Sequence, residues 1–169
     1  MKRNGLWALA VALLLLAVAG TACAQTDAVL YIGTQDAGFE QYEVTLPDEL
    51  TADALLGAIE TLTGWKMDLL EPVTSGKGGM SVGFGPESAL FVGPAEPQTE
   101  GFEVLDGYEL AHTLLDSVEK TLQMNFTAEG GDPDALCVYY YMQDDQPLTI
   151  ESIGMSWPID EPYQWPDAQ

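Results

Sequence analysis

The clearest pattern in the chain is helical and covers residues 107–124. Apolar side chains recur there every three or four positions, so at about 100° per residue they form one stripe. The opposite side is polar and includes His112 and an Asp116–Lys120 pair at the favourable i,i+4 spacing. We therefore expect a helix with one face in the core and with His112 in solvent. The stripe consists of Leu110, Leu114, Val118 and Leu122.

A second helical pattern covers residues 51–63. Thr51 is a favourable N-cap residue, and Gly64 is a favourable stop just after the last turn. Leu55 and Ile59 lie on one side of this segment together with Leu62. This segment is therefore also expected to be an amphipathic helix.

Short apolar or alternating segments around the helices predict strands. Residues 28–32 and 40–46 flank a polar turn and predict a hairpin. The order of strands, helix, strands, helix and strands predicts an α+β fold, with two helices packed on one face of a mixed or antiparallel sheet. Further strands are expected at 66–70, 80–84, 88–92, 136–142 and 148–155.

The body of the chain, residues 25–169, is long enough to bury one core, so we expect a single domain. Residues 94–101 are rich in Pro and Glu and are expected to form an irregular surface connection. From about Trp157 onward, three prolines exclude a regular helix or a central strand. We therefore expect an irregular C-terminal tail.

Residues 1–24 have the parts of a bacterial export signal. They consist of a basic start with Lys2 and Arg3, an apolar run at 6–19 and small residues at the end. A spanning helix needs about 20 apolar residues, so this run is too short to cross a membrane. The segment predicts an extracytoplasmic protein.

Two cleavage sites remain possible for this signal. Residues 22–24 (ACA) fit cleavage before Gln25, whereas residues 20–23 (GTAC) resemble a bacterial lipobox. In the second case Cys23 is the lipid-anchor residue, and the protein is held on the outer face of the membrane. In the first case it is secreted.

The body is strongly acidic. Without the signal, three lysines and no arginine stand against 27 acidic side chains. A field of this sign repels phosphate backbones and anionic headgroups. We therefore expect no nucleic-acid partner, and membrane contact through the lipid anchor alone.

The thiols and the single histidine predict neither a disulfide nor a metal centre. Cleavage at either site leaves Cys137 without a disulfide partner, and its apolar surroundings favour an inert buried thiol. One His with unclustered Cys does not supply the ligands of a zinc site. We expect no cofactor and no metal.

One constellation imitates a hydrolase. Residues 79–83 (GMSVG) fit the G-x-S-x-G motif around Ser81, and Asp106 and His112 follow in the order of a catalytic triad. That motif requires a sharp strand-to-helix turn, and Pro86 disfavours a helix directly after it. We read the segment as a strand flanked by glycines and keep Ser81, Asp106 and His112 as rival catalytic candidates.

Residues 105–159 carry a more extended pattern. A helical segment at 114–122 (LLDSVEKTL) precedes an apolar strand at 136–142, a turn, a restart at Pro147-Leu148 and a closing segment. This pattern resembles the C-terminal half of the sporulation and spore germination (GerMN) domain family. The turn has Asp144-Asp145 where that family often has Asp-Gly.

The resemblance implies a fold and a setting rather than an activity. The GerMN family is associated with exported or lipid-anchored bacterial proteins, some of them in spore formation, and no catalytic residues carry over. The preferred hypothesis is a non-enzymatic interaction domain of the cell envelope that binds an envelope protein or another copy of itself. The alternative is a small secreted or anchored hydrolase or ligand-binding protein that acts on envelope material.

Overall fold

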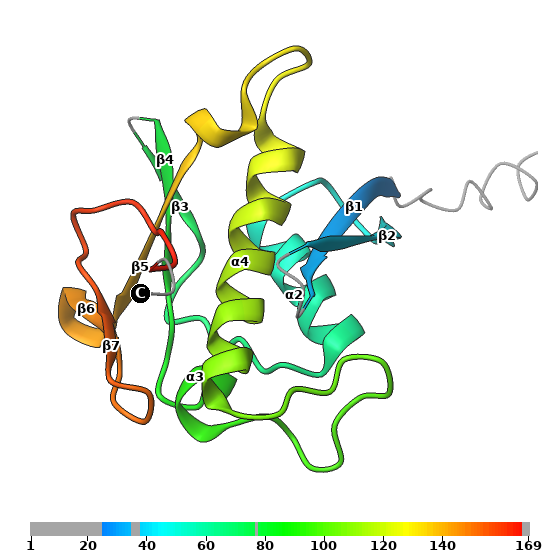
Figure 1. Ribbon diagram of the computed structural model, residues 1–169. Helices are drawn as coiled ribbons and strands as arrows, with labels where there is room; N and C mark the ends of the chain where they lie inside the picture. Colours follow the sequence, from blue (N-terminus) through cyan, green and yellow to red (C-terminus); the bar gives the residue numbers. More distant parts are fainter. Residues whose placement is uncertain (1–24, 35–37, 77, 167–169) are drawn as a thin grey trace, which may run out of the picture.

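The computed structural model describes residues 25–34, 38–76 and 78–166, and within them the predicted α+β class is confirmed. The long helix α4 (Gly107–Phe126) stands between two groups of strands (Figure 1). On one side of α4 lies a five-stranded sheet, and on the other side lie α2 and a two-stranded hairpin. The hairpin is thus a separate sheet, although the sequence order alone suggested a single one.

The five-stranded sheet is mixed. Its order is β3-β4-β5-β6-β7, in which β4 and β5 run parallel and the other neighbours run antiparallel. The strands are β3 (Thr74–Gly76), β4 (Gly79–Gly83), β5 (Cys137–Met142), β6 (Gln146–Ile150) and β7 (Met155–Trp157). The parallel pair needs a long crossover, and α4 lies within that connection.

Both predicted helices are confirmed, and α2 has the predicted caps. In α2 (Ala52–Thr63) the Thr51 hydroxyl accepts a hydrogen bond from the Ala54 N–H at 3.1 Å, and Gly64 ends the helix at φ 77°. In α4 the Asp106 carboxylate accepts one from the Glu109 N–H at 2.9 Å. The apolar stripe of α4 is fully buried, as the pattern predicted.

The hairpin consists of β1 (Thr26–Gly33) and β2 (Phe39–Leu46), and α4 covers the free edge of β1 with polar side chains. The Gly33 N–H donates to Ser117 at 2.9 Å, and the Tyr31 N–H donates to Thr121 at 2.9 Å. Two strand residues and four helix residues both advance about 6 Å, so this pairing stays in register. The helix therefore supplies hydrogen-bond partners to the edge of β1, as a third strand would.

Two of the expected strands are wrong, and a third, at 148–155, is replaced by two antiparallel strands with a turn at 151–154 between them. Residues 66–70 contribute only an isolated bridge between Leu69 and Phe84. Residues 88–92 form the helical turn α3 (Ala89–Val92), because the Ser88 hydroxyl accepts a hydrogen bond from the Leu90 N–H. Short apolar segments do not distinguish a buried strand from a buried helical turn.

The C-terminal tail has no helix or strand between residue 158 and residue 166, where its description ends. It is nevertheless fastened to the core. Tyr163 is 3% exposed, and its N–H donates to the Val138 carbonyl at 2.7 Å. The irregular tail is therefore a strap across β5 and α4.

Candidate functional site

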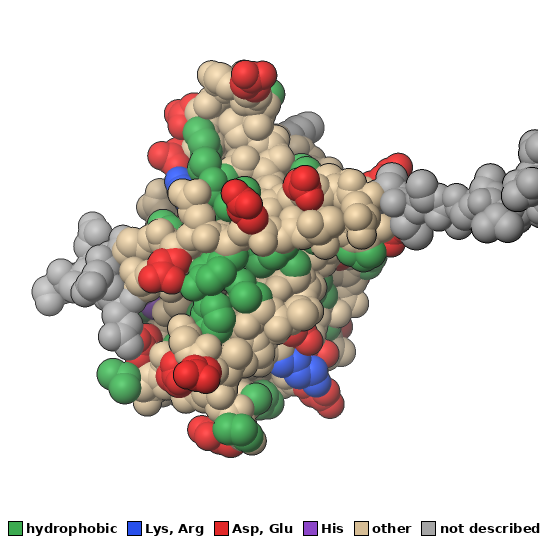
Figure 2. Space-filling view, turned by 90° about the vertical axis from the view of Figure 1, so that its right-hand side faces the viewer, with side chains coloured by type: hydrophobic (Ala, Val, Ile, Leu, Met, Phe, Trp, Pro, Cys, Tyr) green, Lys and Arg blue, Asp and Glu red, His purple; other side chains and the backbone are tan. Residues whose placement is uncertain are grey.

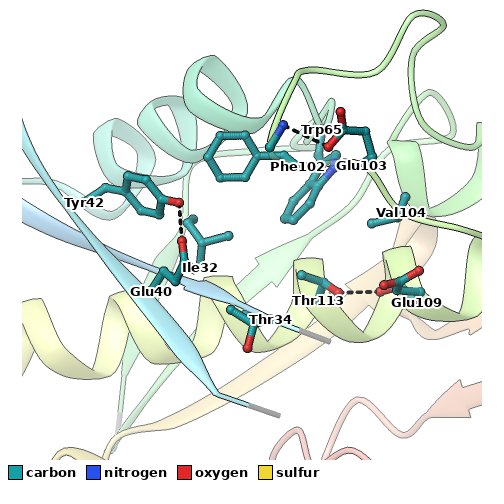
Figure 3. A pocket seen from close by; sticks show the side chains of 12 residues that line it. Ile32, Thr34, Glu40, Tyr42, Trp65, Phe102, Glu103, Val104, Glu109 and Thr113 are labelled. Atoms are coloured by element: carbon teal, nitrogen blue, oxygen red, sulfur yellow. Dashed lines mark hydrogen bonds between the residues drawn. The ribbon is translucent and has the colours of Figure 1, made fainter. Parts of the chain in front are cut away.

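A pocket of about 290 Å³ opens where the hairpin, the first half of α4 and the connection before α4 meet (Figure 3). The hairpin and α4 are fixed to each other by the hydroxyl contacts with β1, so two of its walls are rigid. The third wall comes from residues 101–104 and from Trp65, which follows α2. We call this space the aromatic–acidic pocket; its principal side chains are Glu40, Tyr42, Trp65, Phe102, Glu103 and Glu109.

Three aromatic rings form one side of the aromatic–acidic pocket. The Tyr42 and Phe102 rings lie 5.5 Å apart between centroids, and Trp65 meets Phe102 edge-on at 6.4 Å. The Gln98 side-chain amide braces this wall, because it bonds both the N–H and the carbonyl of Val104 at 2.8 and 3.0 Å. The irregular connection thereby holds Phe102 against the other two rings.

Three carboxylates line the pocket, and in each of them one oxygen accepts a hydrogen bond from the protein itself. Glu40 accepts from the Tyr42 hydroxyl at 2.7 Å, Glu103 from the Gly101 N–H at 2.9 Å, and Glu109 from the Leu105 N–H at 2.6 Å. All three bonds go to Oε2, and across the described ranges the Oε1 atoms have no partner. The bond to Glu40 also raises the pKa of the Tyr42 phenol.

The indole nitrogen of Trp65 is the other unused group of the pocket. Trp65 is 2% exposed, and its Nε1 is a buried donor with no hydrogen-bond partner among the described residues. An unpaired buried N–H costs about 1–3 kcal/mol, so such groups are rare in folded proteins. This donor therefore calls for a partner that the described part of the chain does not supply.

The described lysines do not neutralise these carboxylates. Lys66 pairs with Glu87, and Lys120 lies 3.5 Å from Asp134. Figure 2 shows acidic side chains spread over the face it presents, with basic side chains at isolated points only. The aromatic–acidic pocket is therefore a region of uncompensated negative charge.

The rival catalytic residues have separate structural roles. Ser81 lies in β4, paired with Thr74 and Tyr139, while Asp106 caps α4. His112 lies on α4 and contacts Asp116, with Nε2 and Oδ2 3.1 Å apart. Within residues 25–34, 38–76 and 78–166, no hydrogen bond joins any two of the three candidates.

The glycines around Ser81 have a packing explanation. A Cβ on Gly79 would come within 2.7 Å of the Tyr139 ring, and a Cβ on Gly83 within 2.5 Å of the Tyr141 ring. Both tyrosines stand on the neighbouring strand β5. The G-x-S-x-G spacing thus makes room for two aromatic side chains and forms no strand-to-helix turn.

A second group of aromatic and acidic side chains lies under the strap. The expected solvent position of His112 and the expected Asp116–Lys120 pair are both wrong here. His112 stacks on Trp165 with centroids 4.4 Å apart, and Asp116 accepts the Tyr163 hydroxyl instead. We call this group the tail cluster: His112, Asp116, Tyr140, Trp157, Tyr163 and Trp165.

Burial perturbs the acids of this region. It raises the pKa of Asp116, against the opposing effects of the Tyr163 hydroxyl and His112. Beside the tail cluster, burial raises the pKa of Glu119 to about 7; nearby Asp116 adds to this rise and Lys120 opposes it. The half-buried Cys137 lines the same hollow as Glu119.

The expectations for residues 1–24, including the export signal and Cys23, lie outside the described residues. In the part of the chain that is described, no helix is long and apolar enough to cross a membrane. In that same part, no group of three His, Cys, Asp or Glu residues is placed to hold a metal ion. The chain finds no match among protein families, curated proteins or solved structures.

Proposed function

We propose that this chain is a non-enzymatic binding domain of the bacterial cell envelope that works outside the cytoplasm. The observation that carries the proposal is the aromatic–acidic pocket, in which recognition groups with unused hydrogen-bonding capacity converge on one concave site. Its aromatic walls supply contact area, and its free carboxylate oxygens supply specificity.

The composition of the pocket favours binding over covalent catalysis. Its lining contains no Ser, Cys, His or Lys, the usual nucleophiles and bases of acyl transfer. The three carboxylates hold their places through bonds to their own chain. These groups are arranged to hold a ligand.

The proposed setting rests on the N-terminal sequence. A signal of the length of residues 1–24 supports export, and acylation of Cys23 would keep the acidic domain at the membrane. A role in sporulation or germination is supported by the GerMN resemblance alone. Mass spectrometry of the N-terminus of the exported protein distinguishes acylated Cys23 from cleavage before Gln25.

The binding proposal is tested with the full-length protein and isolated envelope material. We expect saturable binding that a Glu40→Gln/Glu103→Gln double variant weakens at least about fivefold, since it removes two of the three negative charges at the pocket. Glu43→Gln is the matched control, because Glu43 is exposed on the same strand, as Glu40 is, but lies outside the pocket. Equal binding by all three proteins would overturn the proposal.

The rival hydrolase is tested on the same material. If the wild-type protein turns over an envelope ester or glycan and Ser81→Ala abolishes that turnover, the non-enzymatic proposal fails. If Ser81→Ala retains full binding and neither protein shows turnover, the binding proposal stands. Ser81 is half-buried in a strand, so its replacement by Ala is a mild change to the fold.

A second candidate function is protein docking on β2, the only partner of β1 in its two-stranded sheet. Among the described residues no strand pairs with the far edge of β2 (Figure 1). Beside that edge lies an apolar groove lined by Val44, Ala58 and Leu62 among others. An extended segment of an envelope protein would add a strand there. Crosslinking from a cysteine placed at Thr45, which is exposed and lines the groove, tests this contact.

A further inference from the structure

We infer that the aromatic–acidic pocket binds an organic ammonium group that carries a hydrogen-bond acceptor close to its charge. This inference rests on the proposed binding function and adds the chemical class of the ligand. It follows from three features of the pocket: its charge, its aromatic walls and the unpaired indole N–H.

The negative charge of the pocket favours a cationic ligand. Each of Glu40, Glu103 and Glu109 keeps one carboxylate oxygen without a partner in the described structure, and the described lysines are paired with Glu87 and Asp134. Three uncompensated carboxylates around one cavity repel each other. A bound cation relieves that repulsion, and an anionic ligand would increase it.

The aromatic walls favour an organic cation over a metal ion. The faces and edges of Tyr42, Trp65 and Phe102 offer the π surface on which a quaternary or primary ammonium group is stabilised. The carboxylates do not converge as metal ligands, since no group of three acids or histidines in the described ranges is placed to hold an ion. Carboxylates that are spread around aromatic rings suit an organic ammonium group better than a metal ion.

The indole N–H of Trp65 adds a requirement that a simple alkylammonium does not meet. This buried donor needs an acceptor, and the acids of the pocket are not bonded to it. Because Nε1 is closed off from solvent, a hydroxyl or carbonyl oxygen beside the ammonium would pair with it only after residues 101–104 of the neighbouring wall move. The ligand is then an amino alcohol, or an amine next to a carbonyl group.

The size of the cavity limits how much of the ligand enters. At about 290 Å³ it lies at the lower end of the range for small-molecule sites. A free amino alcohol fits as a whole, and a larger envelope molecule would insert its ammonium end only. The same chemistry serves both sources.

The inference is tested by calorimetric titration of the full-length protein with choline and ethanolamine. The third titrant is the uncharged isostere of choline, in which carbon replaces nitrogen. We expect at least one ammonium probe to bind with Kd below about 1 mM, and the isostere to bind at least about tenfold more weakly. Competition with envelope material then separates the sources, because displacement shows that the envelope ligand uses the same pocket.

Variants tie the binding to the pocket. Glu103→Gln and Glu40→Gln are each expected to weaken ammonium binding about fivefold to tenfold, and Phe102→Leu about fivefold. Glu43→Gln removes the same charge from the other face of β2 and is expected to change affinity less than about twofold. If Phe102→Leu unfolds, the two Glu→Gln variants carry the test.

The two proposals fail in different ways. If the isostere binds as well as choline, or if Glu43→Gln weakens binding as much as Glu103→Gln, the ammonium inference is overturned. If no ammonium probe binds while envelope binding still depends on Glu40 and Glu103, the ligand class is wrong and the binding function stands. If envelope binding is also independent of these residues, both proposals are wrong.

Discussion

The aromatic–acidic pocket and the tail cluster are built from the same kinds of side chain and differ in what those side chains have left to bond. In the tail cluster the Tyr140 hydroxyl donates to the Leu115 carbonyl at 2.7 Å, and the Trp157 indole donates to Gln164 at 3.1 Å. In the pocket the Trp65 indole has no partner in the described chain. These polar groups of the tail cluster have hydrogen-bond partners within the protein, whereas the Trp65 indole N–H of the pocket has none in the described chain.

This difference separates structure from function better than composition does. Both groups combine tyrosine, tryptophan and carboxylates, so each looks like a binding site in outline. Buried polar groups in folded proteins are paired in the great majority of cases, so a set that is left unpaired requires an explanation. The tail cluster holds the strap to α4, whereas the pocket is where we propose that a ligand binds.

The largest expected effect is on the strap. Tyr163→Ala removes a buried ring that packs against Tyr140 at 4.9 Å between centroids. We expect the free energy of unfolding to fall by about 3–5 kcal/mol, measured by urea denaturation, because a large cavity replaces the ring. Ligand affinity of the folded protein should not change. A loss below about 1 kcal/mol would show that the tail is not part of the core.

The second expected effect concerns Glu119, which lies beside the tail cluster. Burial raises its pKa to about 7, from an ordinary value near 4.3. Because the folded-state pKa is raised, this group's contribution to stability is full below about pH 4.3 and is lost as the pH rises through about 7. Ionised Glu119 is therefore destabilising at pH 8.

Glu119→Gln should remove this pH dependence. At pH 8 we expect the variant to be about 1–3 kcal/mol more stable than the wild type, a figure reduced to allow for the partial exposure of Glu119. At pH 5 most of that difference should be gone. Urea denaturation at the two pH values measures it, and a gain that is equal at both would contradict the assigned burial effect.

The fold was largely predictable from the sequence because its strongest determinants are local. The stripe along α4 and the Thr51 and Gly64 caps specify two helices without reference to the rest of the chain. The separate hairpin sheet was not predictable, since it depends on Ser117 and Thr121 reaching the edge of β1. Their four-residue spacing was visible, but nothing in the sequence indicated what they would bond.

The candidate site was harder to predict because no motif marks it. Residues 40–46 were expected to form one strand of a hairpin, and Glu103 and Glu109 were counted only among the 27 acidic side chains. Their convergence depends on the irregular connection before α4, whose path is set by the Gln98 amide. The G-x-S-x-G match had a local signal and a packing cause, whereas the pocket has a tertiary cause and no local signal.

The third prediction compares the two buried tryptophans. Trp65→Phe and Trp157→Phe both shrink an indole to a phenyl ring, but only Trp157 donates a hydrogen bond, to the Gln164 carbonyl. Removing a satisfied donor leaves a carbonyl unpaired, and removing an unsatisfied donor relieves a cost. We expect Trp157→Phe to be about 1–2 kcal/mol more destabilising than Trp65→Phe by urea denaturation.

The same pair separates stability from binding. Trp65→Phe should weaken the binding of an ammonium ligand that carries an acceptor, while Trp157→Phe should leave the affinity of the folded protein unchanged. Titration with choline measures both. Equal losses of stability, with no change in affinity for either variant, would show that the Trp65 indole N–H is not a ligand contact.

The smallest expected effect is that of Tyr42→Phe, in a comparison of the two pairs of a tyrosine hydroxyl with a carboxylate. Tyr42 and Glu40 are bonded near the surface, whereas Tyr163 and Asp116 are bonded under the strap. Tyr42→Phe should change the free energy of unfolding by less than about 0.5 kcal/mol, because water replaces the lost partner. Tyr163→Phe should cost about 1–3 kcal/mol, since it leaves a half-buried carboxylate with one partner fewer. If the two losses of stability are equal, the pocket and the tail cluster do not differ in how far the protein satisfies their hydrogen bonds.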